Sequence, residues 1–217
     1  MGVNEKMTAI ADAIRDKTGK TEALGLDAMA ESIGDVYEAG QKSEYDLFWD
    51  NFQDYGNRRM YYGAFAGWND TIFKPKYPIK CITNTSMFYM STITDVPVID
   101  CSEATALSST FSYTDYLATI EKWILKNDGS QAFNTPFQGC RGLVNIVVEG
   151  VIGKNGISLQ WATKLSKASI TSFVDALSST TSGLTITFSK TAKEAVFAAD
   201  EWAALIATKS NWTISLV

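Results

Sequence analysis

The sequence contains no histidine among its 217 residues. Ser-His-Asp and Cys-His nucleophiles need an imidazole base, and most zinc hydrolase sites need an imidazole ligand, so these enzyme classes are excluded. Glycosidase chemistry needs two carboxylates and no histidine. The candidates are scattered over loop-like positions and strand edges, and we interpret them as solvated charges: Asp100, Asp115, Asp128 and Glu149. We therefore predict a protein that is not an enzyme, with no catalytic residue, cofactor or metal site.

Cysteine is also scarce. Cys81, Cys101 and Cys140 are an odd number and form no C-x-x-C pair, which argues against a disulfide framework and against a zinc site. Cys140 lies three residues after Phe137, and we predict that it fills a small buried position.

Long apolar runs and basic stretches are absent as well. No run approaches the roughly 18 apolar residues of a membrane span, so we expect none. The first residues lack the basic-then-apolar layout of a signal peptide, and we expect synthesis and folding in the host cytoplasm. Residues 1–60 hold 7 Lys/Arg against 12 Asp/Glu, and the remainder holds 12 of each. No basic face results, so we expect no nucleic-acid partner.

What the sequence does have is a recurring phenylalanine. Phe65, Phe88, Phe111 and Phe137 are separated by steps of 23, 23 and 26 residues. In the last two copies a Leu and an Ile recur at the same offset of 26. Such a period is typical of a solenoid, in which stacked units line equivalent side chains into one core. We attribute the three extra residues of the longest unit to a turn at residues 127–130.

The N-terminal segment favours helices. Residues 7–14 carry an apolar stripe at helical spacing, and a second helix is expected over residues 27–54 with a coiled-coil-like seam. This seam indicates either self-association or packing in a helical hairpin, and both alternatives stay open. Residues 45–65 are dense in aromatics, which suit a cap on the open end of a solenoid.

The remaining pattern is of alternating strands and helices. Strands are predicted at residues 94–100, 118–125, 144–151, 184–188 and 212–216. Pro97 favours an edge position or a strand start for the first of them. Helices are predicted over residues 168–177, with Ala168 on the apolar face, and 193–207. The fold class is therefore α+β, with N-terminal helices over 1–60, a short solenoid over 61–183 and a strand-helix-strand cap over 184–217.

Several phrases carry a resemblance to a known family. The stretch Ile10-Ala-Asp-Ala-Ile-Arg-Asp-Lys-Thr-Gly19 resembles the N-terminal helices of tail and appendage proteins from phages and prophages of Firmicutes. Four further phrases are similar to short leucine-rich-repeat proteins of such prophages, whose repeats resemble the BspA-like surface class: residues 44–54, 73–77, 149–153 and 210–214. The resemblance implies a BspA-like leucine-rich-repeat solenoid in a virion tail or appendage, and it transfers no catalytic residue.

Three functions remain open. The preferred one is a non-enzymatic tail fibre, tip or receptor-binding subunit that forms a homo-oligomer through its N-terminal helices. Its partners would be other tail proteins or a host surface protein or glycan. The alternatives are an intracellular repeat-type interaction module and a carbohydrate-binding or carbohydrate-processing module. Tyr89, Tyr113 and Tyr116 follow the repeat phenylalanines and are the candidate ligand-binding residues.

Overall fold

The computed structural model describes residues 8, 10–13, 15–16, 59–60, 65–69, 79–81 and 84–217. The chain divides into two compact parts, Met1–Asp54 and Tyr55–Val217. In the first part the described residues are helical, in agreement with the predicted first helix. The second predicted helix, its seam and the aromatic segment before Phe65 lie outside the described residues, and oligomerisation through the N-terminal helices stays a prediction.

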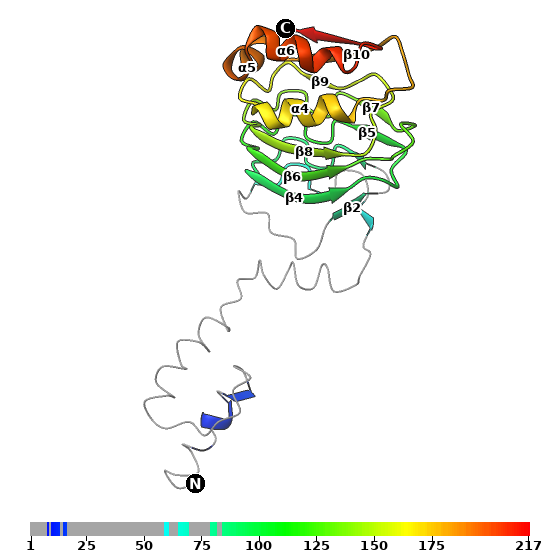
Figure 1. Ribbon diagram of the computed structural model, residues 1–217. Helices are drawn as coiled ribbons and strands as arrows, with labels where there is room; N and C mark the ends of the chain where they lie inside the picture. The colour runs from blue at the N-terminus through cyan, green and yellow to red at the C-terminus, as the bar shows by residue number, and fades with distance from the viewer. Residues whose placement is uncertain are drawn as a thin grey trace. The chain divides into compact units, whose positions relative to one another are not determined.

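The second part is mixed α/β with parallel sheets (Figure 1). Its described strands form sheets in the orders β1-β2-β4-β6-β8, β3-β5-β7 and β11-β10-β9, and every pairing is parallel. The strands are β1 (Arg59–Met60), β2 (Ile79–Cys81), β3 (Asn84–Thr85), β4 (Asp95–Asp100), β5 (Ala106–Ser108), β6 (Thr119–Ile124), β7 (Ala132–Asn134), β8 (Asn145–Glu149), β9 (Ser158–Leu159), β10 (Leu184–Phe188) and β11 (Trp212–Leu216). The helices are α4 (Lys167–Ala176), α5 (Lys190–Val196) and α6 (Ala199–Ala207).

The recurring phenylalanines form one file. Ring centroids lie 5.3 Å apart from Phe65 to Phe88, 5.5 Å from Phe88 to Phe111 and 5.4 Å from Phe111 to Phe137, with interplanar angles of 15°, 5° and 14°. The last three are fully buried. The prediction that these residues stack is confirmed, and the spacing is close to that of neighbouring strands in a sheet.

Each of the stacked phenylalanines begins a tight turn that is repeated from unit to unit. The N–H three positions later donates back to its carbonyl, as Ser91 does to Phe88 at 3.1 Å and Cys140 does to Phe137 at 3.2 Å. Successive turns are also joined by backbone hydrogen bonds, as the Phe88 N–H donates to the Thr110 carbonyl at 2.8 Å. Hydrogen bonding between units therefore continues through the turns.

A fifth unit follows that the sequence pattern did not reveal. Its ladder position holds Leu159, which is fully buried and accepts from the Ala162 N–H at 3.1 Å as the phenylalanines do in their own turns. A hydrogen bond sets the register of this unit on the one before it, because the Thr135 N–H donates to the Gly156 carbonyl at 3.0 Å, as the Ser109 N–H donates to the Asn134 carbonyl at 2.9 Å one unit earlier. The recurrence was hidden because leucine replaces phenylalanine. We define the ladder residues as Phe65, Phe88, Phe111, Phe137 and Leu159.

The extra residues of the longest unit enter at two places. The pairing offset is 23 between β3 and β5, 24 between β4 and β6, and 26 between β5 and β7. One residue is therefore gained before β6, and two are gained between β6 and β7, where residues 127–130 form the predicted turn. Attributing all three to that turn was wrong.

The prediction for Pro97 was also wrong in part. This residue lies inside β4, which has β2 on one side and β6 on the other. Its missing N–H is accommodated because the β4–β6 register passes directly from the Val96–Ile120 pair to the Val98–Lys122 pair. On the other side, the described pairing with β2 involves Ile99 and Asp100.

Helix α4 covers the edge strand of the five-stranded sheet (Figure 1). The Ser169 hydroxyl accepts from the Ile146 N–H at 2.9 Å and donates to the Val144 carbonyl at 3.0 Å. The helix occurs where it was predicted, and Ile170, Phe173, Val174 and Leu177 of its apolar face are buried. The prediction was wrong for Ala168, which is exposed, while Ser169 is buried instead. Serine is favoured there because its hydroxyl satisfies backbone groups that another strand would otherwise pair.

The C-terminal region contains the predicted strands β10 and β11, which pair in parallel. The single helix predicted between them is two helices, α5 and α6. Phe197 breaks the run with extended backbone angles (φ −125°, ψ 130°), and its buried ring packs edge-on against Trp202 at 5.6 Å. Within the described part of the chain, no helix has both the length and the apolar character that a membrane span requires.

Candidate binding surface

The site is built on the backbone position two residues after each ladder residue. In four units this residue has a left-handed conformation: Gly67 (φ 68°), Met90 (φ 56°), Tyr113 (φ 60°) and Gly139 (φ 74°). The equivalent residue of the fifth unit is Trp161. Side chains at these positions lie on the outer side of the tight turns.

Large apolar side chains gather along these turns. Exposed fractions are 59% for Met90, 42% for Tyr113, 67% for Tyr116 and 42% for Trp161. These four are half of the large apolar residues found exposed in the described part of the chain. We call the row formed by Tyr89, Met90, Tyr113, Tyr116 and Trp161, with Asp115 and Arg141, the aromatic edge.

Two members of the edge occupy a conformation that disfavours them. A left-handed backbone costs a residue with a side chain about 1 kcal/mol or more relative to glycine. Glycine fills this position at residues 67 and 139, whereas Met90 and Tyr113 place bulky side chains there. Ser86, Ser109 and Thr135 also have a positive φ in these turns, so it is the bulk of Met90 and Tyr113 that sets them apart.

Neighbouring units hold the Tyr113 ring in place. Tyr89 packs against it edge-to-face, with centroids 5.7 Å apart and planes at 86°. On its other side lies Gly139, where an added Cβ would come within 2.9 Å of the ring carbon Cδ1 of Tyr113. The ring is therefore positioned by contacts from both neighbouring units while 42% of the residue stays exposed.

A charged pair adds polar groups to the edge. Arg141 Nη1 donates to Asp115 Oδ1 at 2.9 Å, and both side chains are about half exposed. The Arg141 guanidinium also lies 5.3 Å from the Trp161 ring centroid, a cation–π contact. These contacts place the guanidinium over one face of the indole, across two units.

The predicted ligand-binding residues are brought together only in part. Tyr89 and Tyr113 are in contact, with Tyr89 half-buried and acting as a support. Tyr116 is the most exposed aromatic of the edge. Sequence reasoning missed Met90 and Trp161. Both lie two positions after a ladder residue, as Gly67 and Gly139 do, and this shared position is the sequence signal that could have identified them.

The carboxylates considered for glycosidase chemistry each have a local partner. Asp100 Oδ1 accepts from Ser102 Oγ at 2.6 Å, and Glu149 pairs with Lys122 at 2.9 Å. The Asp128 carboxylate accepts from the Ser130 N–H at 2.9 Å, and its hydrogen bonds from Ser130 lower the pKa of this carboxyl. The fourth, Asp115, is paired in the aromatic edge.

Cys140 is a buried repeat position, as predicted. It lies against Thr114 of the preceding unit, with Sγ and Oγ1 3.5 Å apart, and its thiol donates to the Phe111 carbonyl at 2.7 Å. Burial raises the pKa of this thiol to about 12. All three cysteines are buried. Among the described residues no group of three His, Cys, Asp or Glu side chains is placed to hold a metal ion.

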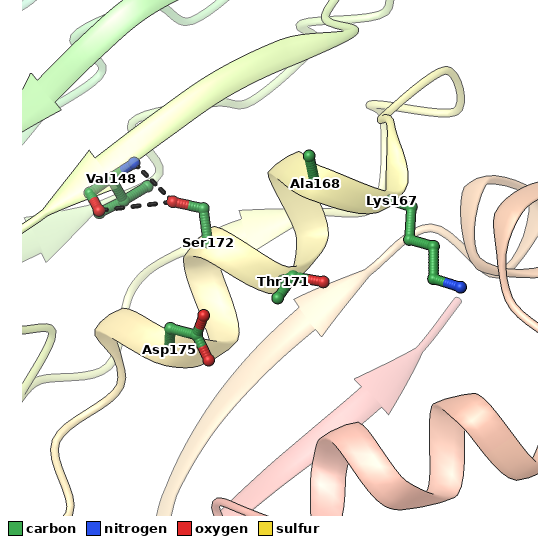
Figure 2. Close-up of a pocket in the computed structure, with 6 residues that line it drawn as sticks. All are labelled: Val148, Lys167, Ala168, Thr171, Ser172 and Asp175. Atoms are coloured by element: carbon green, nitrogen blue, oxygen red, sulfur yellow. Dashed lines mark hydrogen bonds between the residues drawn. The ribbon is translucent and has the colours of Figure 1, made fainter.

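A shallow concavity of about 620 Å³ lies on the outer face of α4 (Figure 2). Two of its polar side chains, Ser172 and Lys167, form hydrogen bonds within the fold. The Ser172 hydroxyl points toward β8 and accepts from the Val148 N–H at 2.8 Å (Figure 2), while Lys167 Nζ donates to Glu201 at 2.6 Å. These two side chains hold α4 against its neighbours, and we do not assign a binding role to the concavity.

Comparison with known proteins identifies no relative. No family model matches the chain, and neither a curated protein nor a solved structure is detectably similar to it. The site itself must therefore support any functional conclusion.

Proposed function

We propose that this protein is a non-enzymatic recognition protein, a short BspA-like leucine-rich-repeat solenoid that presents the aromatic edge to a surface partner. The stacked phenylalanines, the parallel strands at offsets of 23 to 26 residues and the repeated turns support the solenoid assignment. The sequence phrases that resemble those of prophage-encoded proteins support a role in a phage tail or appendage, as a receptor-binding or structural subunit.

The observation that carries the proposal is Tyr113. Its backbone conformation is one that glycine adopts without cost, and 42% of the residue is exposed to solvent. The ring packs against Tyr89 and over Gly139, outside the file of ladder residues, so the core itself does not require a tyrosine at this position. Its retention is explained if a partner contacts the ring, because tyrosine and tryptophan supply much of the binding energy in recognition surfaces.

The experiment compares binding of the full-length protein to cell walls of Firmicutes with that of Tyr113→Gly. Glycine suits the left-handed backbone, so the variant should fold with nearly unchanged stability and lose binding. Ser109→Gly is the matched control, because Ser109 also has a positive φ (50°) in the same unit but lies outside the edge. Equal binding by the wild type and Tyr113→Gly would refute the proposed role of the edge.

A second measurement tests the tail assignment. Mass spectrometry on purified induced phage particles should detect peptides of this chain. Their presence only in the soluble fraction of the host would favour the intracellular interaction module instead.

A further inference from the structure

We infer that the aromatic edge binds an extended, uncharged carbohydrate chain that crosses the units from Tyr113 to Trp161. This inference rests on the proposed function and specifies the chemistry of the partner. Three properties of the edge carry it: exposed aromatic side chains, hydrogen-bonding groups beside them, and the spacing between them.

The rings supply the first property. Tyr113, Tyr116 and Trp161 are between 42% and 67% exposed, and Tyr113 is held in place from both sides. The electron-rich face of an aromatic ring attracts the weakly positive C–H groups that cover one face of a pyranose. Tyr113 is held by both neighbouring units, and Trp161 carries the Arg141 guanidinium over one face, which leaves its other face for a sugar. Because these contacts exist before any ligand arrives, little conformational entropy is lost when a sugar stacks on the rings.

The Asp115–Arg141 pair supplies the second property. Arginine carries five N–H donors and a carboxylate accepts several hydrogen bonds, so the 2.9 Å contact between them uses a fraction of their capacity. Both side chains are about half exposed, at 57% for Arg141 and 48% for Asp115. Sugar hydroxyls, which donate and accept at once, can bond to both partners. Because the two charges offset each other, the pair favours a neutral sugar over a phosphate-bearing polymer.

Geometry supplies the third property. Tyr113 belongs to the third unit and Trp161 to the fifth. Adjacent units are separated by one strand spacing, so these two positions lie on the order of 10 Å apart along the stack. A short run of linked pyranose rings spans such a distance. The edge offers a few large side chains in a row, whereas a standard protein interface recruits about 20 to 30 residues a side. A narrow chain is therefore the better fit.

The test uses binding of the full-length protein to purified cell walls that are treated in two ways. Periodate cleaves the vicinal diols of sugars, whereas protease digestion removes wall proteins. We expect binding to survive protease and to be lost after periodate. Tyr113→Gly and Trp161→Ala should each weaken binding by about tenfold, and Ser109→Gly should leave it unchanged. Oligosaccharides released from the same walls should compete at least tenfold better as tetrasaccharides than as monosaccharides.

The opposite outcomes separate the two proposals. Binding that survives periodate but is lost after protease, and that still depends on Tyr113, would overturn the carbohydrate inference and leave the proposed recognition function standing. Binding that none of the edge variants alters, or no binding to any wall preparation, would overturn both. Tyr113→Phe guards against misfolding, because it keeps the ring and should lose no more than about threefold in affinity.

Discussion

The ring of Tyr113 lies over Gly139, the residue at the same position of the next unit, and fills the space that a side chain there would need. The two residues therefore form a complementary pair, because the aromatic ring of one unit depends on the missing side chain of the next. The left-handed backbone at both positions makes glycine the easy choice and tyrosine the exception.

This relationship predicts the effect of Gly139→Ala. The new Cβ would meet Tyr113 Cδ1 at 2.9 Å and would also sit at a φ of 74°. We expect a loss of unfolding free energy of about 2 kcal/mol, measured by denaturant unfolding, together with displacement of the Tyr113 ring and weaker ligand binding. Gly183→Ala is the control, since Gly183 has a φ of 73° and no atom near its Cβ position. Its loss should be about 1 kcal/mol, and equal losses for the two variants would show that the ring contact is unimportant.

The phenylalanine file predicts a graded response to truncation. Phe111 is fully buried between two stacked rings, so Phe111→Ala should lower the unfolding free energy by about 3 to 5 kcal/mol. Phe111→Leu should cost about 1 to 2 kcal/mol, because the Leu159 position shows that leucine also fills a ladder site. Met90→Ala, at a side chain that is 59% exposed, should change stability by less than about 0.5 kcal/mol. A similar loss from all three substitutions would contradict a core organised by this file.

The parts of the fold that were predictable are those in which side-chain chemistry repeats. The phenylalanine steps predicted the stacked file, and enrichment in Val, Ile, Thr and Trp predicted β4, β6 and β8. The unit at Leu159 was not found because the ladder accepts either side chain of sufficient volume. The break at Phe197 was not found because it depends on packing against Trp202, which is a tertiary contact.

The candidate site was predictable to a lesser degree. Tyr89, Tyr113 and Tyr116 stand out as aromatics after the ladder residue, but sequence does not say which of them is exposed. That depends on backbone conformation, which places Tyr113 outward and Tyr89 beneath it. Trp161 belongs to the edge through its register with Gly139, and this register is visible only once the fifth unit is recognised.

The junction of α4 with the sheet predicts a cost for losing one hydroxyl. Ser169→Ala would leave the buried Ile146 N–H without its partner, whereas the Val144 carbonyl would keep the Ser166 N–H, which donates to it at 2.9 Å. An unsatisfied buried backbone group costs about 1 to 3 kcal/mol, and we expect a loss in that range by denaturant unfolding. Thr171 lies on the same helix and lines the outer concavity. Thr171→Ala should lower the unfolding free energy by less than about 1 kcal/mol. Because alanine has a higher helix propensity than serine or threonine, helix propensity cannot cause a loss in either variant, and equal losses would contradict a role for the edge hydrogen bonds of Ser169.

The contact between α4 and α6 predicts a dependence of stability on pH. Lys167 Nζ donates to Glu201 at 2.6 Å, and this hydrogen bond, with a second from the Ala198 N–H, holds the pKa of Glu201 below its ordinary value of 4.5. A carboxyl whose pKa is lower in the folded state stabilises the fold above its unfolded pKa. That contribution is lost as the pH falls through the folded pKa. Both side chains are about half exposed, so the effect should be small and weakened by salt.

The measurement compares melting temperatures of the wild type and Glu201→Gln from pH 7 down to pH 3. The variant keeps an acceptor for the Ala198 N–H but carries no charge, so it should melt lower at pH 7 and approach the wild type as the pH drops below 4.5. Glu194→Gln is the control, because its 3.9 Å pair with Lys190 lies within α5 and joins no two helices. A constant difference between wild type and Glu201→Gln across the whole range would mean that the Glu201 charge does not stabilise this junction. Loss of the difference at pH 7 in high salt would agree with an exposed ion pair.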